Sequence, residues 1–209
     1  MKTTDKSIAK SKDEIRQALL QERLSLPEAS VLAMSSAIQD TVLRSPYWPQ
    51  HGRIGLYSSV KNEVLTFTLF QKALEQGLHV YFPRVEQGLK FYEVNGPEEL
   101  QRGAWAIPEP IIECKPLLDG EVFDLLIVPG VAFTKDCHRI GYGKAFYDRV
   151  MEDVGPVCVG LAYDFQVVPQ IPTEPWDKIL TAVVTEKRVY ELEKRVYELG
   201  KREYESGHK

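Results

Sequence analysis

The stretch FDLLIVPG, residues 123–130, is the feature that most restricts how this chain can fold. It is a continuous apolar run that ends in Pro-Gly, and such runs are typical of strands that are buried on both faces. A strand of that kind needs a layer of structure above its sheet and another below it. The run therefore predicts an inner strand of a sheet that helices cover on both sides.

The rest of the chain alternates between strand and helix patterns. Further strands are predicted over residues 53–59, 78–85, 89–94, 157–163 and 180–186. Helices are predicted over residues 5–24, 29–43, 63–77 and 144–153, with a short helical piece at 97–103. Strands separated by helices indicate a largely parallel sheet. We expect one α/β domain, residues 1–186, with the two N-terminal helices packed on it.

The C-terminal segment has a different pattern. EKRVYEL occurs at 186–192 and again at 193–199, and this places Val189, Leu192, Val196 and Leu199 at the a and d positions of a heptad. A third heptad opens with a glycine and lacks both apolar residues. Residues 187–209 are therefore interpreted as a charged surface helix that packs on the body or frays. A dimerisation helix is the alternative, and we otherwise expect a monomer.

Composition excludes several functional classes. The net charge is −4, and 44% of the 209 residues are apolar, which argues against a nucleic-acid or membrane partner. No window resembles a membrane span or a signal peptide. The three cysteines are far apart and the histidines lack metal-ligand spacing, so we expect neither a disulfide framework nor a zinc site. These features favour a cytoplasmic protein.

The loop after the apolar run carries the clearest chemistry. It contains RIGYGKAFYDR, residues 139–149, in which Arg139 and Lys144 supply positive charge and Gly141 and Gly143 allow close approach of backbone amides to an anion. Ligands of open parallel sheets bind at the carboxyl ends of strands, and helix N-termini attract anions. The loop matches neither a Walker A motif nor a dinucleotide fingerprint. A phosphate cradle and a simple tight turn both remain open on these residues alone.

Three carboxylates lie near the same predicted edge. Asp148 falls one turn into the following helix, and Asp177 lies between two predicted strands. Carboxylates near phosphate groups commonly hold Mg²⁺, although each could equally be a helix-dipole partner or a turn residue. Glu63 follows the strand at 53–59 and would face the same crevice, or else serve as an N-terminal charge on the next helix.

Two further candidates are less specific. Lys12 and Arg16 stand at positions i and i+4 of the first helix, so both project from one face, which could bind an anion or be a solvated basic face. Trp105, in GAWAIPEP (103–110), could form an aromatic wall for a planar ligand or plug a loop.

Six ordered segments together resemble the 5-formyltetrahydrofolate cyclo-ligase (methenyltetrahydrofolate synthetase) family. They are the helix with Lys12 and Arg16, NEVLT, YFPRV, GAWAIPEP, the stretch from DLLIVPGVAF to RIGYGKAFYDR, and WDKILTAVVTE. The similarity spans residues 10 to 186. It implies a three-layer α/β/α fold and an ATP- and Mg²⁺-dependent ring closure of 5-formyltetrahydrofolate to 5,10-methenyltetrahydrofolate, with release of ADP and phosphate. A non-catalytic folate- or nucleotide-binding relative and a sugar-phosphate isomerase are the alternatives.

The resemblance also implies roles for individual residues. Catalytic roles fall to Lys144 and Arg139. ATP would be bound by Lys12, Arg16, Arg139, Ile140, Gly141, Tyr142, Gly143, Lys144, Ala145, Phe146 and Tyr147. The reduced folate would be bound by Ser58, Glu63, Trp105, Tyr142, Phe146 and Tyr147. Mg²⁺ would be held by Asp148 and Asp177.

The chain departs from the family pattern at four positions. Ala145 and Phe146 stand where the family has Gly and Tyr, and Thr134 and Cys137 stand where it has Asp and Gly. Ala145 adds a methyl group where backbone would approach a ligand. We expect these changes to affect catalytic efficiency more than the fold.

Overall fold

The computed structural model describes residues 11–153 and 157–192. Within these residues the strands β1 to β3, β6 and β9 to β11 form one seven-stranded sheet in the order β11-β10-β9-β6-β1-β2-β3. The inner pairs are parallel, and the two edge strands, β3 and β11, pair antiparallel with their neighbours. The predicted largely parallel sheet is confirmed.

The bounds of the elements are as follows. The main sheet contains β1 (Arg53–Gly55), β2 (His79–Val85), β3 (Leu89–Glu93), β6 (Leu125–Val128), β9 (Cys158–Leu161), β10 (Ala182–Val184) and β11 (Val189–Glu191). Two small hairpins pair β4 (Leu100–Arg102) with β5 (Pro108–Pro110), and β7 (Ala132–Phe133) with β8 (Arg139–Ile140). The helices are α1 (Lys12–Leu24), α2 (Glu28–Leu43), α3 (Phe67–Glu75) and α4 (Phe146–Asp153), with 3-10 turns at Pro97–Glu99, Ala104–Ala106 and Asp164–Gln166.

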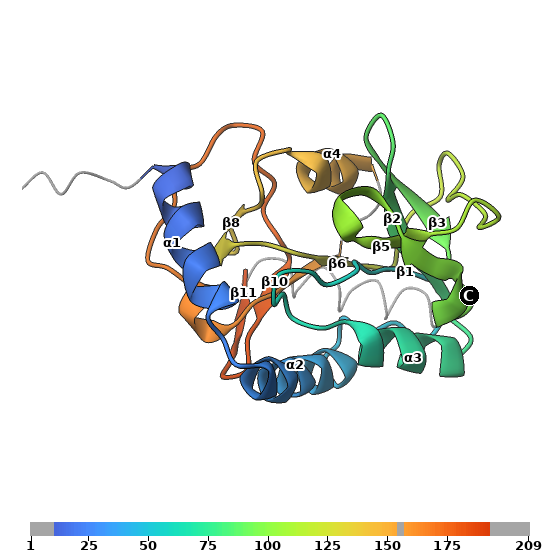
Figure 1. Ribbon diagram of the computed structural model, residues 1–209, viewed down its shortest axis with the longest axis horizontal. Coiled ribbons are helices and arrows are strands. Elements are labelled where there is room, and N and C mark those ends of the chain that lie inside the picture. Colours follow the sequence, from blue (N-terminus) through green and yellow to red (C-terminus); the bar gives the residue numbers. More distant parts are fainter. Residues whose placement is uncertain (1–10, 154–156, 193–209) are drawn as a thin grey trace, which may run out of the picture.

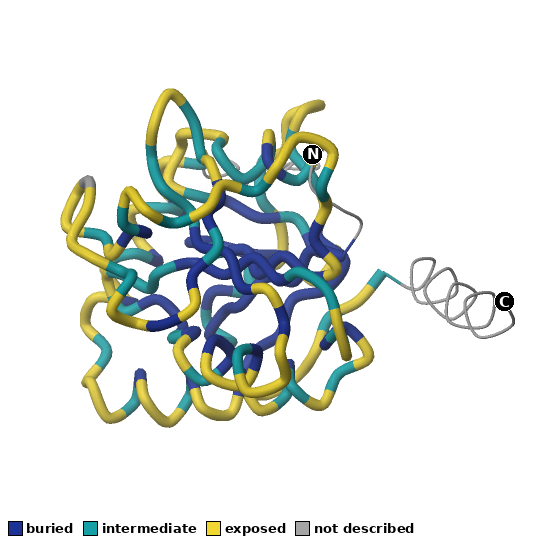
Figure 2. The backbone as a smooth tube through the Cα atoms, turned by 90° about the vertical axis from the view of Figure 1, so that its right-hand side faces the viewer, coloured by how far each residue is buried: buried dark blue, intermediate teal, exposed yellow. Residues whose placement is uncertain are grey.

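Helices lie on both faces of the sheet, as a buried central strand requires. Figure 1 shows α2 and α3 on one side of the strands and α4 on the other. Alternate residues of β6 divide between the two layers: Ile127 packs in the α2–α3 cluster, whereas Leu126 packs with Val150 of α4. The strands form the buried centre of the molecule, and the connecting loops are largely exposed (Figure 2).

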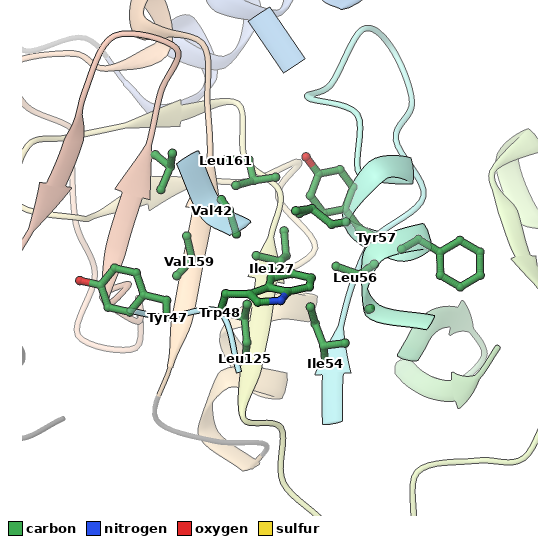
Figure 3. Packing of buried hydrophobic residues seen from close by; sticks show 14 of the residues in the cluster. Val42, Tyr47, Trp48, Ile54, Leu56, Tyr57, Leu125, Ile127, Val159 and Leu161 are labelled. Carbon is green, nitrogen blue, oxygen red and sulfur yellow. The ribbon is translucent and has the colours of Figure 1, made fainter. Parts of the chain in front are cut away.

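The layer under α2 and α3 is the larger apolar core. Side chains of Ile54, Ile127 and Val159, from three adjacent strands, project into the same layer as Val42 and Trp48 (Figure 3). The Trp48 indole also donates a hydrogen bond of 2.7 Å to the Gln76 side chain, just beyond α3. This core fixes α2 and α3 against the sheet and leaves the carboxyl ends of the strands uncovered.

Helix α1 lies apart from this core. Its residues Ile15 and Leu19 pack on Val131, Ala132 and Ile140, that is, on the β7–β8 hairpin beyond the end of β6. The helix begins with a capping box formed by Ser11 and Glu14. The first of the two predicted N-terminal helices thus covers the hairpin beyond the carboxyl end of β6.

The structure corrects several predicted boundaries. The strand predicted over 53–59 ends at Gly55, and the helix predicted from residue 63 begins at Phe67. The helix predicted from Lys144 begins at Phe146, because Gly143 and Ala145 have φ angles of 91° and 51°, which no α-helix contains.

The start of the C-terminal tail was predicted wrongly. Residues Val189–Glu191 form β11, which pairs antiparallel with β10, so this part of the predicted heptad helix is an edge strand. Residues up to 191 thus pair with the sheet, and the domain boundary at 186/187 stays a prediction. Val196, Leu199 and the remaining heptads lie outside the described residues, so the helical tail and dimerisation through it stay predictions.

The sheet core supports a direct stability test. Replacing the fully buried Ile127 by alanine should lower the free energy of unfolding by about 2–5 kcal/mol, because it leaves a cavity between β6 and the α2–α3 layer. Ile112→Ala is the matched control, since Ile112 is 80% exposed and should change stability by about 0.5 kcal/mol or less. Urea denaturation measures both. Equal losses in the two variants would contradict the described core.

Candidate active site

A cavity of about 870 Å³ lies where α1, the β7–β8 hairpin and the loops after β1 and β6 meet. The residues predicted for the site all contribute to its wall: Lys12, Arg16, Ser58, Glu63, Trp105, Arg139, Ile140, Gly141, Tyr142, Gly143, Lys144, Ala145, Phe146, Tyr147, Asp148 and Asp177. These residues come from five separate segments of the sequence. The structure therefore brings the predicted candidates together in one place.

The two cations of α1 face the cavity. The Lys12 ammonium lies 2.5 Å from the Asp177 carboxylate, and the Arg16 Nε donates a hydrogen bond of 2.8 Å to the Gly141 carbonyl. The Arg16 side chain is 20% exposed. Both cations are therefore fixed against the glycine loop and its neighbours, which excludes a freely solvated basic face.

The glycine loop, residues 139–147, leads from β8 into α4. Its turn depends on positive φ angles at Gly143 and Ala145, and the N-terminus of α4 follows directly. Backbone amides and the positive end of a helix dipole thus adjoin the cavity wall, an arrangement that favours anions.

Arg139 is a buried cation that has unused hydrogen-bond donors. Its side chain is 4% exposed and its Nη2 lies 3.0 Å from the Asp148 carboxylate. That contact is too poorly aligned for a hydrogen bond, and among the described residues neither Nε nor Nη2 has a hydrogen-bond partner. Buried donors are almost always satisfied in proteins. Arg139 is therefore well suited to receive an anionic ligand in the cavity.

On the opposite side of the cavity from Arg139, the loop after β1 supplies a buried carboxylate. Glu63 is 4% exposed, and its Oε2 accepts a hydrogen bond of 3.0 Å from the Val60 amide. Its Oε1 lies 3.7 Å from the Arg23 guanidinium and near the Tyr142 hydroxyl, and within the described part of the chain neither this oxygen nor the hydroxyl of Ser58 has a well-aligned hydrogen-bond partner. Burial raises the pKa of Glu63, and the nearby Arg23 guanidinium opposes that rise.

Aromatic side chains surround these polar groups. Tyr142 lies between the Arg139 side and the Glu63 side of the cavity. Its hydroxyl accepts a hydrogen bond from Arg23, and burial next to Glu63 raises the pKa of Tyr142 to about 12. Tyr147 packs in the core at the base of the cavity. Trp105 and Trp176 are 67% and 63% exposed, so both offer ring surface at the cavity opening. Trp105 has a φ of 53°, a left-handed conformation that is unusual for a bulky side chain.

The two aspartates lie close to each other. The Asp148 carboxylate accepts a hydrogen bond of 3.3 Å from the amide of Lys178, the residue that follows Asp177. Each aspartate also has a cation beside it, Arg139 for Asp148 and Lys12 for Asp177. No cluster of three or more His, Cys, Asp or Glu side chains that could hold a metal occurs in the part of the chain that is described. Two carboxylates without a further protein ligand fit Mg²⁺, which keeps waters and binds phosphate oxygens.

Sequence reasoning missed four residues of this region. Lys61, Glu109 and Trp176 line the cavity, and Arg23 is buried beneath it. Glu109 and Trp176 do occur in segments already singled out, GAWAIPEP and WDKILTAVVTE, but no role was attached to them. Arg23 has no local signal, since an arginine in the last turn of a helix is ordinarily a dipole partner.

Fold and cavity together define a class of protein. The protein is a three-layer α/β/α sheet protein whose cavity lies beyond the carboxyl ends of the parallel strands. One side of the cavity has cationic hydrogen-bond donors without partners in the described structure, and the other side has a buried carboxylate. This is the arrangement of a small-molecule enzyme. Among the described residues no helix is long and apolar enough to cross a membrane.

The sequence comparisons identify the family. The pattern of the 5-formyltetrahydrofolate cyclo-ligase family matches residues 8–186, and the chain belongs to this family of enzymes. A probable 5-formyltetrahydrofolate cyclo-ligase of Caenorhabditis elegans is 28% identical over 195 residues, which cover 86% of this chain and 95% of the relative. The 5-formyltetrahydrofolate cyclo-ligase of Escherichia coli is 32% identical over 145 residues, covering 66% of this chain and 80% of the relative.

A solved structure agrees with this assignment. The NMR structure of the Aquifex aeolicus 5,10-methenyltetrahydrofolate synthetase superimposes with a TM-score of 0.75 at 33% identity, covering 87% of this chain and 92% of that one. A methenyltetrahydrofolate synthetase from Mycoplasma pneumoniae shares the fold, with a TM-score of 0.67 at 22% identity.

The conformation of Ala145 makes a stability prediction. Ala145→Gly should raise the free energy of unfolding by about 1 kcal/mol, because alanine is strained at a φ of 51° and glycine is not. Ala33→Gly, at an exposed position inside α2, should lower it by about 1 kcal/mol. Opposite signs for the same substitution, measured by urea denaturation, would verify the left-handed turn. A loss of stability in both variants would contradict it.

Proposed function

We propose that this protein converts 5-formyltetrahydrofolate to 5,10-methenyltetrahydrofolate in a reaction that consumes ATP, requires Mg²⁺ and releases ADP and phosphate. The observation that carries the proposal is that one cavity contains both buried hydrogen-bond donors and a buried hydrogen-bond acceptor that lack partners within the described chain. Arg139 has buried donors without a hydrogen-bond partner and Glu63 has a buried acceptor without a well-aligned one, among the described residues. The first suits a phosphate, and the second suits a ligand with N–H donors.

The nucleotide is assigned to the side of the cavity formed by α1 and the glycine loop. Lys12, Arg16, Arg139 and Lys144 supply positive charge there, and the amides of the loop and the N-terminus of α4 supply further donors. Asp148 and Asp177 are assigned to Mg²⁺, which when bound would neutralise charge on the phosphate oxygens. Cations and carboxylates that pair with each other in the free protein would then pair with phosphate and metal.

The reduced folate is assigned to the side of the cavity that contains Glu63. A pterin presents an amino group and a ring N–H as adjacent donors, which a carboxylate accepts well. Ser58 offers a second polar contact, and Trp105, Tyr142, Phe146 and Tyr147 supply the surrounding aromatic wall.

Catalysis in this arrangement depends on placement and charge stabilisation. The oxygen of the formyl group attacks the terminal phosphorus of ATP, and ADP leaves, which produces an iminium phosphate on the folate. A neighbouring secondary amine of the folate then attacks the formyl carbon, loses its proton and closes the ring, and phosphate departs. Arg139 and Lys144 stabilise the charge on the phosphoryl group during transfer. No covalent bond to the protein is needed.

The proposal is tested by product formation. The purified protein should form the methenyl chromophore from 5-formyltetrahydrofolate with ATP and Mg²⁺, and should fail to form it when either is omitted. Folate binding without turnover would indicate a non-catalytic relative, and turnover of a sugar phosphate without ATP would indicate an isomerase. Both outcomes contradict the proposal. The cytoplasmic location and the monomeric state expected from the sequence stay predictions.

Lys144 provides a specific test of the nucleotide side. Lys144→Ala should raise the KM for ATP by about tenfold or more, because a charge-assisted contact to phosphate is lost. Lys135→Ala is the control, since Lys135 is an exposed lysine of the β7–β8 hairpin that does not line the cavity. Steady-state kinetics measure both. An unchanged KM for ATP in Lys144→Ala would remove its assigned role.

Glu63 provides a pH test of the folate side. Burial raises the pKa of Glu63, and only its ionised form accepts both pterin donors. Affinity for 5-formyltetrahydrofolate should therefore be greatest above that pKa and fall as the pH drops through it. Glu63→Gln should bind weakly at every pH and lack this dependence, whereas the exposed control Glu28→Gln should retain the wild-type profile. Calorimetric titration from pH 4.5, the ordinary value for a glutamate, up to pH 8.5 would decide. A pH-independent wild-type affinity would contradict the assignment.

A further inference from the structure

Arg23, near the C-terminal end of α1, is a fully buried cation that contacts three separate parts of the site. Its Nε donates a hydrogen bond of 3.0 Å to the Lys61 carbonyl, and its Nη1 donates one of 3.0 Å to the Gly130 carbonyl. Its Nη2 donates to the Tyr142 hydroxyl and lies 3.7 Å from the Glu63 Oε1. The guanidinium is 1% exposed.

These contacts join segments that have different proposed ligands. Lys61 and Glu63 belong to the loop on the folate side, whereas Tyr142 belongs to the glycine loop, whose backbone amides are assigned to the nucleotide and whose aromatic side chains are assigned to the folate. Gly130 follows β6 at the carboxyl edge of the sheet. The folate-side loop is also fastened to α1 by Asn62, whose side-chain amide donates to the Arg23 and Leu26 carbonyls at 3.2 and 3.3 Å. The buried Arg23 side chain thus fixes the distance between the two halves of the cavity.

Burial of this cation has an electrostatic consequence for Glu63. The titratable groups that face Glu63 are Arg23 from α1, Lys61 from its own loop, Tyr142 and Tyr147 from the glycine loop, Tyr57 after β1, and Tyr163 after β9. Only Arg23 and Lys61 are cations, and Lys61 is exposed. Burial raises the pKa of Glu63, and the Arg23 guanidinium is the main group that opposes this rise.

We propose that Arg23 is a positioning residue of the cyclo-ligase reaction: it places a positive charge beside Glu63 and fixes the position of the folate-side loop relative to the glycine loop. The inference rests on the proposed function for the identity of the ligands. Arg23 itself touches neither substrate. Its guanidinium is required for two separable reasons, its charge next to Glu63 and its planar fork, which reaches three acceptors at once.

Arg23→Lys and Arg23→Met separate these two contributions. Lysine keeps a positive charge beside Glu63 but has no planar fork, so the two halves of the cavity lose their fixed spacing. Methionine removes both. Gln166→Met is the matched structural control, because Gln166 is 1% exposed and donates to the same Gly130 carbonyl, at 3.3 Å, from outside the cavity.

The readouts are the dissociation constant of 5-formyltetrahydrofolate at pH 6 and pH 8, and the KM values for ATP and folate at pH 8. In Arg23→Met the affinity should begin to fall at a higher pH than in the wild type, so the ratio of the dissociation constants, pH 6 over pH 8, should exceed the wild-type ratio, because loss of the cation raises the pKa of Glu63. In Arg23→Lys the ratio should stay within about threefold of the wild type, while both KM values rise about tenfold. Gln166→Met should lower the melting temperature but leave the ratio unchanged.

A direct titration separates this inference from the proposed function. The carboxyl signal of Glu63 in protein carrying carbon-13-labelled glutamate, assigned by its loss in Glu63→Gln, should titrate at higher pH in Arg23→Met than in the wild type. That shift without ATP-dependent turnover in the wild type would count against the proposed function alone. Turnover in the wild type with no such shift would overturn the role of Arg23. If Arg23→Met fails to fold, unchanged KM values in Arg23→Lys would overturn it equally.

Discussion

The burial of β6 on both faces is the constraint on which the rest of the structure depends. Because Leu126 and Ile127 pack into opposite layers, the strand needs α4 on one side and α2 with α3 on the other. Both layers leave the carboxyl ends of the parallel strands open, and α1 covers the β7–β8 hairpin there. The cavity forms at that edge since no element of the core fills it. The position of the site is thus a consequence of how the core is built.

Three cations in or beneath the cavity each lie beside a carboxylate. Lys12 pairs with Asp177, Arg139 approaches Asp148, and Arg23 lies near Glu63. Burying one ion without a partner would cost several kcal/mol, whereas a paired ion is tolerated.

Many of the residues that line the cavity could be singled out from the sequence because they occur in short ordered segments, while their roles stay predictions. Lys12 and Arg16, Glu63, the glycine loop and Asp177 all line the same cavity, as the resemblance to the family implied. Errors arose where local pattern and tertiary contact disagree. The heptad-like residues 189–191 form an edge strand because β10 offers unpaired backbone groups that a surface helix would leave open. The first turn of α4 is displaced because Gly143 and Ala145 adopt positive φ to shape the loop.

The sequence by itself determined the fold class, the parallel order of strand and helix, and the family, because apolar periodicity and motif spacing are local properties of the chain. Only the tertiary structure decided which polar groups are left without partners and which are satisfied. Arg139 and Arg23 are both buried arginines, yet two nitrogens of Arg139 lack a hydrogen-bond partner among the described residues, whereas each donor nitrogen of Arg23 contacts an acceptor. That difference depends on which segments meet around each guanidinium, and residues distant in sequence meet only after the sheet has formed.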